Sequence, residues 1–583
     1  MTSRFLLLSL IVTLISCGEG VKNPASSLRT ENSDLKINEL IGRRTLAAAA
    51  TDSFRLDLDR NAFVYGYVEQ HDVDVVVKIF SPSNKKIAEF DSPARGFENF
   101  RFTTDTAGVF RVSVSGFEGA TGEYSIRING AEPLAMEPGA RVDQIVRASL
   151  GGAVKTPGVA VAVQRDGKLI YDKGFGYADL EQSTKISPTT IFHIASVSKQ
   201  FTAFAIAMLA DQGKISLDDD IRKFFPEMHD FGTPITVRQL AHHTSGLRDQ
   251  WSLLSMAGWR LDDVITMNQI MRLVSKQTEL NFKPGDEHLY CNTGFTLMGE
   301  IVHRVTKKPF SEWCKENIFD PIGMKNTLFY DDHERVVENR AYSYHEGSKG
   351  YQKSVLSYAN AGATSLFTTV EDLSLWAQNF ETMKVGNPNV MKIMESRYVL
   401  NNGDTIDYAF GQVASTYKGL NMRSHGGADA GYRTFFMRFP DQHFSISVFS
   451  NSASFPVTDL SFQLADLYLE KDFKPEPEKS EESQPAPNNT QDQPAFDPNS
   501  VRLADYTGKY YSPELETTYE FVIVNDTLVS HHQRHDDMKL RPTKPDGFNI
   551  SLLGNLAFYR DKGKIAGFRA SNGRVRNLNF IRQ

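Results

Sequence analysis

Ser196-Val197-Ser198-Lys199 is the stretch from which both the fold and the chemistry of this chain can be inferred. A serine hydroxyl is a poor nucleophile unless a base lies beside it. Residues three apart on an α-helix lie on one face, about one turn from each other. If this stretch opens a helix, we expect the Lys199 amine to lie near the Ser196 hydroxyl. The same four residues also fit an ordinary helix start with Ser196 as the N-cap, so the rest of the chain must separate the two interpretations.

The segments around this stretch predict an antiparallel sheet packed between helices. Apolar residues at helical spacing follow it, and they predict a buried helix face that ends at a glycine, namely Phe201, Phe204, Ala205, Met208 and Gly213. Upstream, the Asp166-Gly167 turn predicts a hairpin between residues 159–163 and 169–175. Downstream, residues 432–439 and 444–449 predict paired strands. The sequence therefore predicts one α/β (α+β) domain over residues 135–470.

The N-terminus has the pattern of an export signal. Arg4 precedes an apolar run over residues 5–15, which ends in Leu14-Ile15-Ser16-Cys17. This ending resembles a bacterial lipoprotein lipobox, which implies a signal peptide over residues 1–16 and a lipid anchor on Cys17. We therefore expect an extracytoplasmic protein, periplasmic or at the cell surface, that a tether over residues 17–50 joins to the membrane. An ordinary secretory signal with an incidental cysteine remains the alternative.

Short alternating strands predict a small all-β domain on each side of the central one. Residues 51–132 have the pattern of a β-sandwich, similar to the bacterial pre-peptidase C-terminal domain, and such modules bind or position other partners. Residues 471–500 contain six prolines and few apolar residues, which predicts a disordered linker. Residues 501–583 predict a small β-barrel-like domain. With 583 residues the chain is long enough for this multi-domain organisation.

Charge and cysteine content exclude several functional classes. The net charge of −7 lacks the basic surplus of a nucleic-acid-binding protein, so we expect no nucleic-acid partner. No interior run reaches the roughly 18 apolar residues of a spanning helix. Besides Cys17 the chain has only Cys291 and Cys314, which we expect to be buried thiols. The short-spaced ligand pairs of a metal site are absent from the sequence, and we expect no metal and no organic cofactor.

Four further segments follow Ser196 and Lys199 in a fixed order. They are residues 235–247 with His242-His243-Thr244-Ser245-Gly246, residues 282–294 with Tyr290-Cys291-Asn292, residues 362–373, and the triplet His425-Gly426-Gly427. Together they resemble the serine β-lactamase family over about residues 140–470, closest to the class C branch with its D,D-peptidase and esterase relatives. The resemblance implies a β-lactamase/transpeptidase-like fold for the central domain.

The resemblance also implies a role for each residue of these motifs. Ser196 is the nucleophile that takes the acyl group, and Lys199 and Tyr290 carry its proton. Which of the two acts first stays open. To act as a base, Lys199 needs its pKa lowered from near 10.4 to about 7, which requires roughly 4–5 kcal/mol. The resemblance places Asn292 against Lys199 and a substrate carbonyl. It places the N–H groups of Ser196 and Ala428 in an oxyanion hole, beside Gly426 and Gly427.

His425 departs from the family pattern, because β-lactamases usually carry lysine there. Histidine is mostly neutral above about pH 7, so it does not supply a permanent cation. We therefore expect a serine hydrolase of amide or ester bonds in small molecules or peptides, similar to a D,D-peptidase, a D-aminopeptidase or an esterase. Two alternatives stay open: a true class C-type β-lactamase, and a binding lipoprotein that keeps the fold without catalysis.

Several other polar residues have both a functional and a structural interpretation. Asp249 and Trp251 are candidates for the cavity rim, and Arg433 is a candidate partner of a substrate carboxylate or a solvated strand residue. The His242-His243 pair suggests a catalytic base or a metal pair, but the resemblance places the His-Thr-Ser-Gly-Leu pattern away from proton transfer, so His243 is interpreted as structural. The histidines of the last domain could bind a metal, but they are interpreted as surface or strand-facing residues, namely His531, His532 and His535.

Overall fold

The computed structural model describes residues 33–91, 94–151, 155–347, 349–475 and 496–583. These residues belong to two compact units, Met1–Ala135 and Met136–Gln583. The expected signal peptide, the lipidation of Cys17 and most of the expected linker lie outside the described residues. Within the described ranges, no helix combines the length and the apolar character needed to cross a bilayer.

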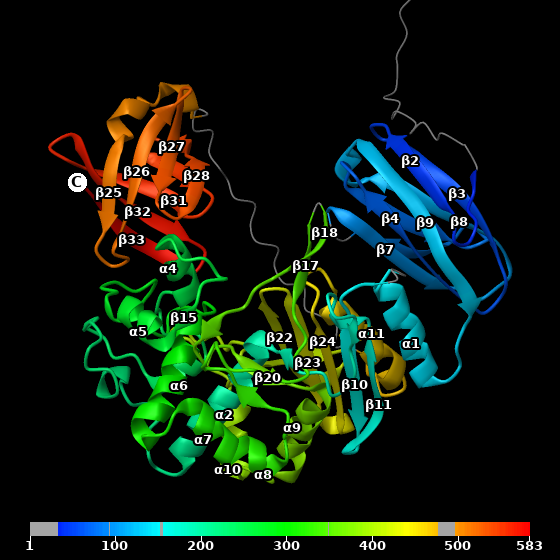
Figure 1. Cartoon of the computed structure of the whole chain (residues 1–583), viewed down its shortest axis with the longest axis horizontal. Coiled ribbons are helices and arrows are strands. Elements are labelled where there is room, and N and C mark those ends of the chain that lie inside the picture. Colours follow the sequence, from blue (N-terminus) through cyan, green and yellow to red (C-terminus); the bar gives the residue numbers. More distant parts are fainter. Residues whose placement is uncertain (1–32, 92–93, 152–154, 348, 476–495) are drawn as a thin grey trace, which may run out of the picture. The chain divides into compact units, whose positions relative to one another are not determined.

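The first unit is a sandwich of two mainly antiparallel sheets that enclose one apolar core (Figure 1). One sheet has the order β1 (Ser33–Asp34), β3 (Thr51–Leu58), β8 (Gly108–Gly116), β5 (Val75–Phe80) and β6 (Lys86–Phe90), with β1 parallel to β3. The other has the order β2 (Leu40–Leu46), β9 (Gly122–Pro133), β4 (Ala62–Gln70) and β7 (Gly96–Thr103). Along inner strands such as β4, β7 and β8, residues near the middle alternate between the core and the outer face, as the sequence pattern predicts.

The second half of the expected tether is part of this sandwich. Residues 40–46 form edge strand β2, which pairs with β9. Of its seven residues only Leu46 is buried, so backbone hydrogen bonds rather than apolar burial hold the strand in place. The tether prediction for residues 17–50 is therefore wrong from Ser33 onward, because a strand that buries so little leaves almost no apolar pattern in the sequence.

An antiparallel sheet of six strands forms the centre of the second unit. Its order is β11 (Lys168–Phe175), β10 (Val159–Arg165), β24 (Phe444–Ser450), β23 (Tyr432–Phe439), β22 (Leu420–Asp429) and β21 (Val413–Tyr417). Strands from both ends of the domain pair in the middle of the sheet, since β10 lies beside β24. The expected hairpin and the expected strand pair are both present.

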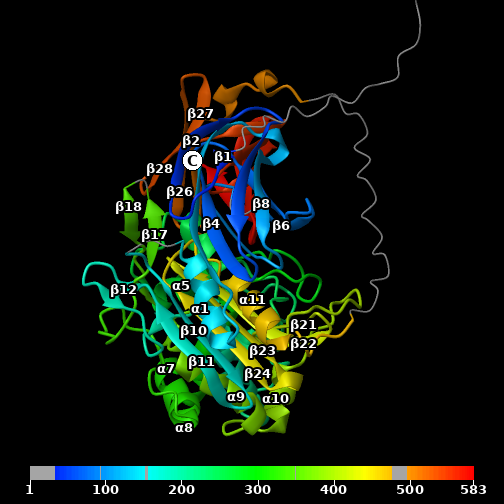
Figure 2. The same ribbon diagram turned by 90° about the vertical axis from the view of Figure 1, so that its right-hand side faces the viewer.

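The two faces of this sheet pack against different helices. On β10, Val159, Val161 and Val163 point into a core shared with α1 (Pro138–Ser149) and α11 (Val457–Leu469). The intervening Ala160 and Ala162 point into the larger core on the other face. Figure 2 shows α1 and α11 against the sheet. Because side chains alternate along a strand, one sequence builds both layers.

The larger core belongs to a helical region that carries the Ser196 segment. Helix α2 (Lys199–Asp211) lies in its middle and is buried on nearly all sides, although Met208 of the expected stripe is only half-buried. The helices around it are α3 (Val237–Ala241), α4 (Gln250–Met256), α5 (Met267–Ser275), α6 (Asn292–Thr306), α7 (Phe310–Cys314), α8 (Asp320–Ile322), α9 (Val370–Thr382) and α10 (Pro388–Met394). Short pairings add β12 (Tyr177–Asp179) to β13 (Thr184–Lys185), β15 (Ile265–Thr266) to β19 (Tyr358–Ala359), β17 (Tyr344–Gly347) to β18 (Gly350–Lys353), and β20 (Leu366–Thr368) between β14 (Phe192–His193) and β16 (Leu328–Phe329).

The C-terminal part is a nine-stranded antiparallel sheet packed on the helical region. Its order is β28 (His535–Lys539), β27 (Thr527–His532), β26 (Thr517–Val524), β25 (Gly508–Ser512), β33 (Val575–Arg582), β32 (Lys564–Asn572), β31 (Gly554–Asp561), β30 (Gly547–Ile550) and β29 (Arg541–Lys544). The buried Arg248 guanidinium donates at 2.6 Å to Glu514, which lies in the turn between β25 and β26. The Tyr519 hydroxyl donates to the Met256 carbonyl oxygen at 2.8 Å. The sheet therefore shares one core with the helices.

Candidate active site

Ser196 lies on a tight turn that immediately precedes α2. The turn, Ala195–Ser198, is a 3-10 helix, and α2 begins at Lys199. Ala195 has φ of +48°, in the left-handed region that a residue with a side chain seldom adopts. The Ser198 hydroxyl fixes the turn, because it donates to the Ala195 carbonyl oxygen at 2.5 Å and accepts from the Leu366 N–H at 3.1 Å. The Ser196 side chain takes part in neither of these two hydrogen bonds, and it lines the cavity described below.

The Lys199 amine contacts the Ser196 hydroxyl, as the helical spacing predicts. Its Nζ lies 3.1 Å from Ser196 Oγ, 2.8 Å from Asn292 Oδ1 and 2.6 Å from the Ala363 carbonyl oxygen. Lys199 is fully buried. Its neutral form has a lone pair that can accept the serine proton.

Burial lowers the pKa of Lys199 to about 7. The negative charges of Asp429 and Asp249 oppose this effect, and the positive charge of Arg574 adds to it. Burial disfavours the ammonium because it removes water from the charge, while nearby carboxylates favour it. The balance leaves about half of the Lys199 side chains neutral at pH 7, where an ordinary lysine is almost entirely charged.

Asp249 fixes the orientation of the Asn292 amide. The Asp249 carboxylate accepts the backbone N–H of Asn292 at 2.7 Å and its side-chain Nδ2–H at 2.8 Å. The same carboxylate caps α4 by accepting from Trp251 N–H and Ser252 N–H. Since Nδ2 faces Asp249, Oδ1 faces Lys199, and one N–H of the amide remains for a ligand. The candidate rim residue Asp249 is thus a buried support of the site, and Trp251 lines the cavity.

The Tyr290 ring lies beside the same amine. Lys199 Nζ is 5.0 Å from the centroid of the ring, and the His243 ring packs against it at a tilt of 37°, with centroids 4.1 Å apart. Burial raises the pKa of Tyr290, while the nearby Ser196 hydroxyl and the Arg574 charge act to lower it. Burial also keeps the pKa of His243 well below its ordinary value, so this histidine is neutral. Its Nδ1 accepts from the Cys291 N–H, which agrees with the structural interpretation.

The end of β22 forms one wall of a cavity that also contains Ser196. The cavity has a volume of about 520 Å³, and its lining includes Ser196, Trp251, Tyr290, Asn292, Thr364, His425, Gly426, Gly427, Ala428, Asp429, Arg433 and Arg574. At Gly427 an added Cβ would lie 2.3 Å from Thr434 Oγ1 and 2.4 Å from the Ile194 carbonyl oxygen. Only glycine fits at Gly427, so the strand can approach the Ser196 turn closely.

His425 is neutral in this wall. Its Nε2 lies 3.0 Å from the Tyr408 hydroxyl and its Nδ1 lies 2.6 Å from the Gly426 carbonyl oxygen. Burial, followed by the charge of Lys199, lowers the pKa of His425 to about 3. The position that carries a lysine cation in β-lactamases therefore carries no charge here near neutral pH.

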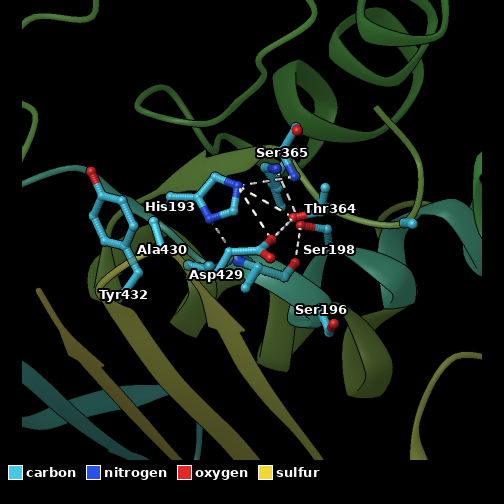
Figure 3. Close-up of polar contacts among 12 residues, drawn as sticks. His193, Ser196, Ser198, Thr364, Ser365, Asp429, Ala430 and Tyr432 are labelled. Carbon is cyan, nitrogen blue, oxygen red and sulfur yellow. Dashed lines mark hydrogen bonds and ion pairs between the residues drawn. The ribbon is translucent and has the colours of Figure 1, made fainter. Parts of the chain in front are cut away.

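A polar cluster of His193, Thr364 and Asp429 lies beside the Ser196 turn (Figure 3). The Asp429 carboxylate accepts from the Thr364 hydroxyl and lies 3.9 Å from His193 Nε2. Burial raises the pKa of Asp429 to about 6. Backbone N–H groups of Ala195 and Ser365 face Nδ1 and Nε2 of His193, each at 3.2 Å, and a neutral ring accepts at one of these two nitrogens. Such donors exclude an imidazolium, in agreement with burial lowering the pKa of His193 to about 3.

The remaining candidates have structural partners. The Arg433 guanidinium donates to the carbonyl oxygens of Ala430 and Tyr432, although the residue lines the cavity. Cys291 and Cys314 are buried thiols, as expected. Within the described ranges, no group of three metal-ligating side chains forms, and the histidines of the C-terminal sheet have other partners. These contacts are His531 with Asp537, His532 with Thr517 and His535 with the Ser255 carbonyl oxygen.

Sequence reasoning missed several cavity residues, among them Asp429, Thr364 and Arg574. Asp429 directly follows the His-Gly-Gly-Ala segment, so its place at the end of a cavity-lining strand was a usable signal. Thr364 lies in the third motif segment without a distinguishing pattern. Arg574 comes from the C-terminal sheet, and its position depends on how that sheet packs on the helices, which no local pattern indicates.

Comparison with known proteins identifies one matching family. The family described as Beta-lactamase matches residues 142–468, which is more than half of the chain. The D-aminopeptidase of Gluconobacter oxydans is 27% identical over 300 residues, which covers 51% of this chain and 56% of that protein. The D-aminopeptidase of Brucella anthropi is 27% identical over 318 residues, which covers 54% of this chain and 60% of that protein. The chain therefore spans little more than half the length of these relatives.

A solved structure shares the fold. The octameric penicillin-binding protein homologue from Pyrococcus abyssi has a TM-score of 0.51 at 21% sequence identity, covering 76% of this chain and 99% of that one. At this identity the likeness concerns the fold alone, and it confirms the β-lactamase/transpeptidase-like architecture that the motifs predict.

Proposed function

The chain belongs to the Beta-lactamase family, and on that premise we propose that it is a serine hydrolase that cleaves amide or ester bonds through an acyl-enzyme on Ser196. The observation that carries the proposal is the contact of 3.1 Å between Ser196 Oγ and the buried amine of Lys199. With its pKa lowered to about 7, this amine is available as a base at neutral pH. A binding protein without catalysis has no need of such a base.

The acylation step moves one proton and exchanges one bond. The Ser196 hydroxyl gives its proton to Lys199 Nζ, either directly or by way of the Tyr290 oxygen, while Oγ forms a bond to the substrate carbonyl carbon. The bond from that carbon to the leaving nitrogen or oxygen then breaks, and the leaving group takes the proton back from Tyr290 or Lys199. Water repeats the sequence on the ester: it attacks the same carbon, and the Ser196 oxygen leaves with the proton.

The oxyanion of the tetrahedral intermediate requires donors fixed in advance. We assign the backbone N–H groups of Ser196 and Ala428 to this role, since both residues line the cavity. Each such donor contributes about 3–4 kcal/mol to the transition state. Gly427 supports the arrangement because a side chain there would push the strand away from the turn. Asn292, held by Asp249, presents its remaining N–H to a substrate carbonyl.

The relatives favour peptides or amides with a D-residue on the acyl side of the cleaved bond, because two of them are named D-aminopeptidases. The neutral His425 supports this choice over β-lactam turnover, because the cation that β-lactamases carry at this position is missing. The natural substrate class we propose is therefore a short D-amino-acid peptide or amide.

The site of action that we propose is a bacterial membrane surface. The lipobox-like ending Leu14-Ile15-Ser16-Cys17 supports a lipid anchor on Cys17 and an extracytoplasmic location. Under this proposal the sandwich of the first unit is an accessory module between anchor and hydrolase. Labelling with radioactive palmitate tests the anchor: the full chain is expected in the membrane fraction with label, and Cys17→Ala without it. An unlabelled wild-type chain contradicts the anchor.

A substrate panel tests the hydrolase. D-alanine p-nitroanilide, its L-enantiomer, a p-nitrophenyl ester and the β-lactam nitrocefin are compared for the wild type and Ser196→Ala. We expect turnover of the D-anilide and the ester, little of the L-anilide and nitrocefin, and none by the variant. Preferred nitrocefin turnover would support the β-lactamase alternative. Absence of turnover of every substrate would support the binding alternative.

A further inference from the structure

Arg574 brings a positive charge from the C-terminal sheet into the cavity of Ser196. It lies in the turn between β32 and β33, directly before β33, and it lines the cavity together with Ser196, Tyr290 and Asn292. Its Cζ is 4.8 Å from the centroid of the Tyr290 ring, a cation–π arrangement on the face of the ring. The cavity is therefore built by two parts of the chain, the helical region and the C-terminal sheet.

The backbone around Arg574 is fixed to the support of the site. The Arg574 carbonyl oxygen accepts from the Asp249 N–H at 3.2 Å and from Asn281 Nδ2 at 2.9 Å. Two residues further on, the Arg576 N–H donates to Asn281 Oδ1 at 2.7 Å, and its guanidinium forms a bidentate pair with Glu287. Because Asp249 also orients Asn292, the turn that carries Arg574 is joined directly to the residues around Ser196.

Apart from its contact with the Tyr290 ring, the Arg574 guanidinium has no hydrogen bond and no ion pair among the residues that the structure describes. Its neighbours in the same sheet differ, since Arg569 pairs with Glu279 and Arg576 pairs with Glu287. The other cavity arginine, Arg433, donates to backbone carbonyl oxygens. Arg574 is exposed to solvent where it lines the cavity, so its five N–H donors are open to a ligand.

We propose that Arg574 binds the carboxylate of the residue released by the reaction, so that the preferred substrate is a short peptide with a free C-terminus. The inference rests on the proposed function. Arg574 lies on the face of Tyr290, a group placed to return the proton to the leaving amine, so it is next to the leaving-group side of the scissile bond. A guanidinium matches a carboxylate with two parallel hydrogen bonds. His425 on β22 is neutral, so it cannot offer a carboxylate a positive charge with two parallel hydrogen bonds.

Binding to an inactive protein tests this recognition apart from catalysis. In the Ser196→Ala background, calorimetry compares D-alanyl-glycine with D-alanyl-glycinamide, which differ only in the carboxylate. We expect the acid to bind about 10- to 100-fold more tightly. Adding Arg574→Gln is expected to reduce this ratio to about 1–3, and Arg574→Lys to an intermediate value. Arg541→Gln, which removes an exposed arginine of the same sheet outside the cavity, is expected to keep the full ratio.

Turnover provides the second readout. Arg574 also affects the pKa of Lys199 and Tyr290, but this effect is shared by both peptides, so the ratio of their kcat/KM values isolates recognition. A ratio that survives Arg574→Gln overturns the proposal, as do equal affinities for the two peptides or no binding of either. Selective binding of the acid that depends on Arg574, without any turnover by the wild type, supports the carboxylate site and instead contradicts the proposed hydrolase.

Discussion

The rate at which Ser196 reacts with a fluorophosphonate depends on pH in a way that the structure fixes. If the neutral amine of Lys199 activates the serine, the rate follows the neutral fraction of that amine. The pKa of Lys199 is lowered from 10.5 to about 7, which corresponds to about 5 kcal/mol of differential interaction. The neutral fraction then rises about 50-fold from pH 5 to pH 7 and only about twofold from pH 7 to pH 9. A lysine with the ordinary pKa gives about a hundredfold rise over each interval.

Two charge-removing variants make this prediction more specific. Asp429→Asn removes the largest of the charges that favour the Lys199 ammonium, so the midpoint of the profile moves to lower pH. Arg574→Gln removes a charge that disfavours the ammonium, so the midpoint moves to higher pH. The second-order labelling constant is measured from pH 5 to pH 10, with Ser196→Ala as the unlabelled control. A hundredfold rise between pH 7 and pH 9, or shifts of both variants in the same direction, would refute the reasoning.

Three further predictions concern packing and stability. Gly427→Ala places a methyl group 2.3–2.4 Å from neighbouring oxygens and is expected to abolish labelling and to cost about 1–3 kcal/mol of stability. The control Gly426→Ala, whose methyl group has its nearest atom at 3.5 Å, is expected to keep both the labelling and the stability. Equal labelling of the two variants would contradict this. Glu514→Gln removes the nearer of the two carboxylates beside the buried Arg248, at 2.6 Å, and leaves Glu279 at 3.7 Å. The variant is expected to cost about 3 kcal/mol in urea unfolding. An unchanged midpoint would show that the pair does not hold the C-terminal sheet. The free energy of unfolding is expected to fall as the pH drops below about 6.5, because His242 binds a proton in the unfolded chain but not in the folded one, where burial lowers its pKa to about 4. At pH 5 this loss amounts to about 2 kcal/mol for each such buried histidine. A thermal midpoint that is constant from pH 7.5 to pH 5 would be inconsistent with it.

Local patterns are sufficient for the elements of the central domain. The Asp166-Gly167 turn predicts the hairpin of β10 and β11, and the spacing of Ser196 and Lys199 predicts their contact, because both depend on neighbours in sequence. The apolar periodicity of α2 predicts one buried face and so underestimates its burial, because the helix lies in the middle of the helical region and is buried on nearly all sides. Strand β2 escapes prediction for the opposite reason, since it buries only Leu46 and is held by backbone pairing.

The contacts of the site that the sequence does not reveal are made between segments that lie far apart in the chain. The Asp249 carboxylate reaches the Asn292 amide only because α4 and α6 pack together, and Arg574 reaches Tyr290 only because the C-terminal sheet packs on the helices. The neutral state of His425 likewise depends on burial, although its departure from lysine is visible in the sequence. Residue types indicate which groups are available, and tertiary packing determines which of them meet.

Mass spectrometry of the protein during turnover tests the acyl-enzyme most directly. The wild type is mixed with an ester of D-alanine, quenched in acid within the first turnovers and digested. The account predicts a mass increase equal to one D-alanyl group on the peptide that contains Ser196, and its absence in Ser196→Ala. Hydrolysis without any adduct, or an adduct confined to another residue, would contradict it.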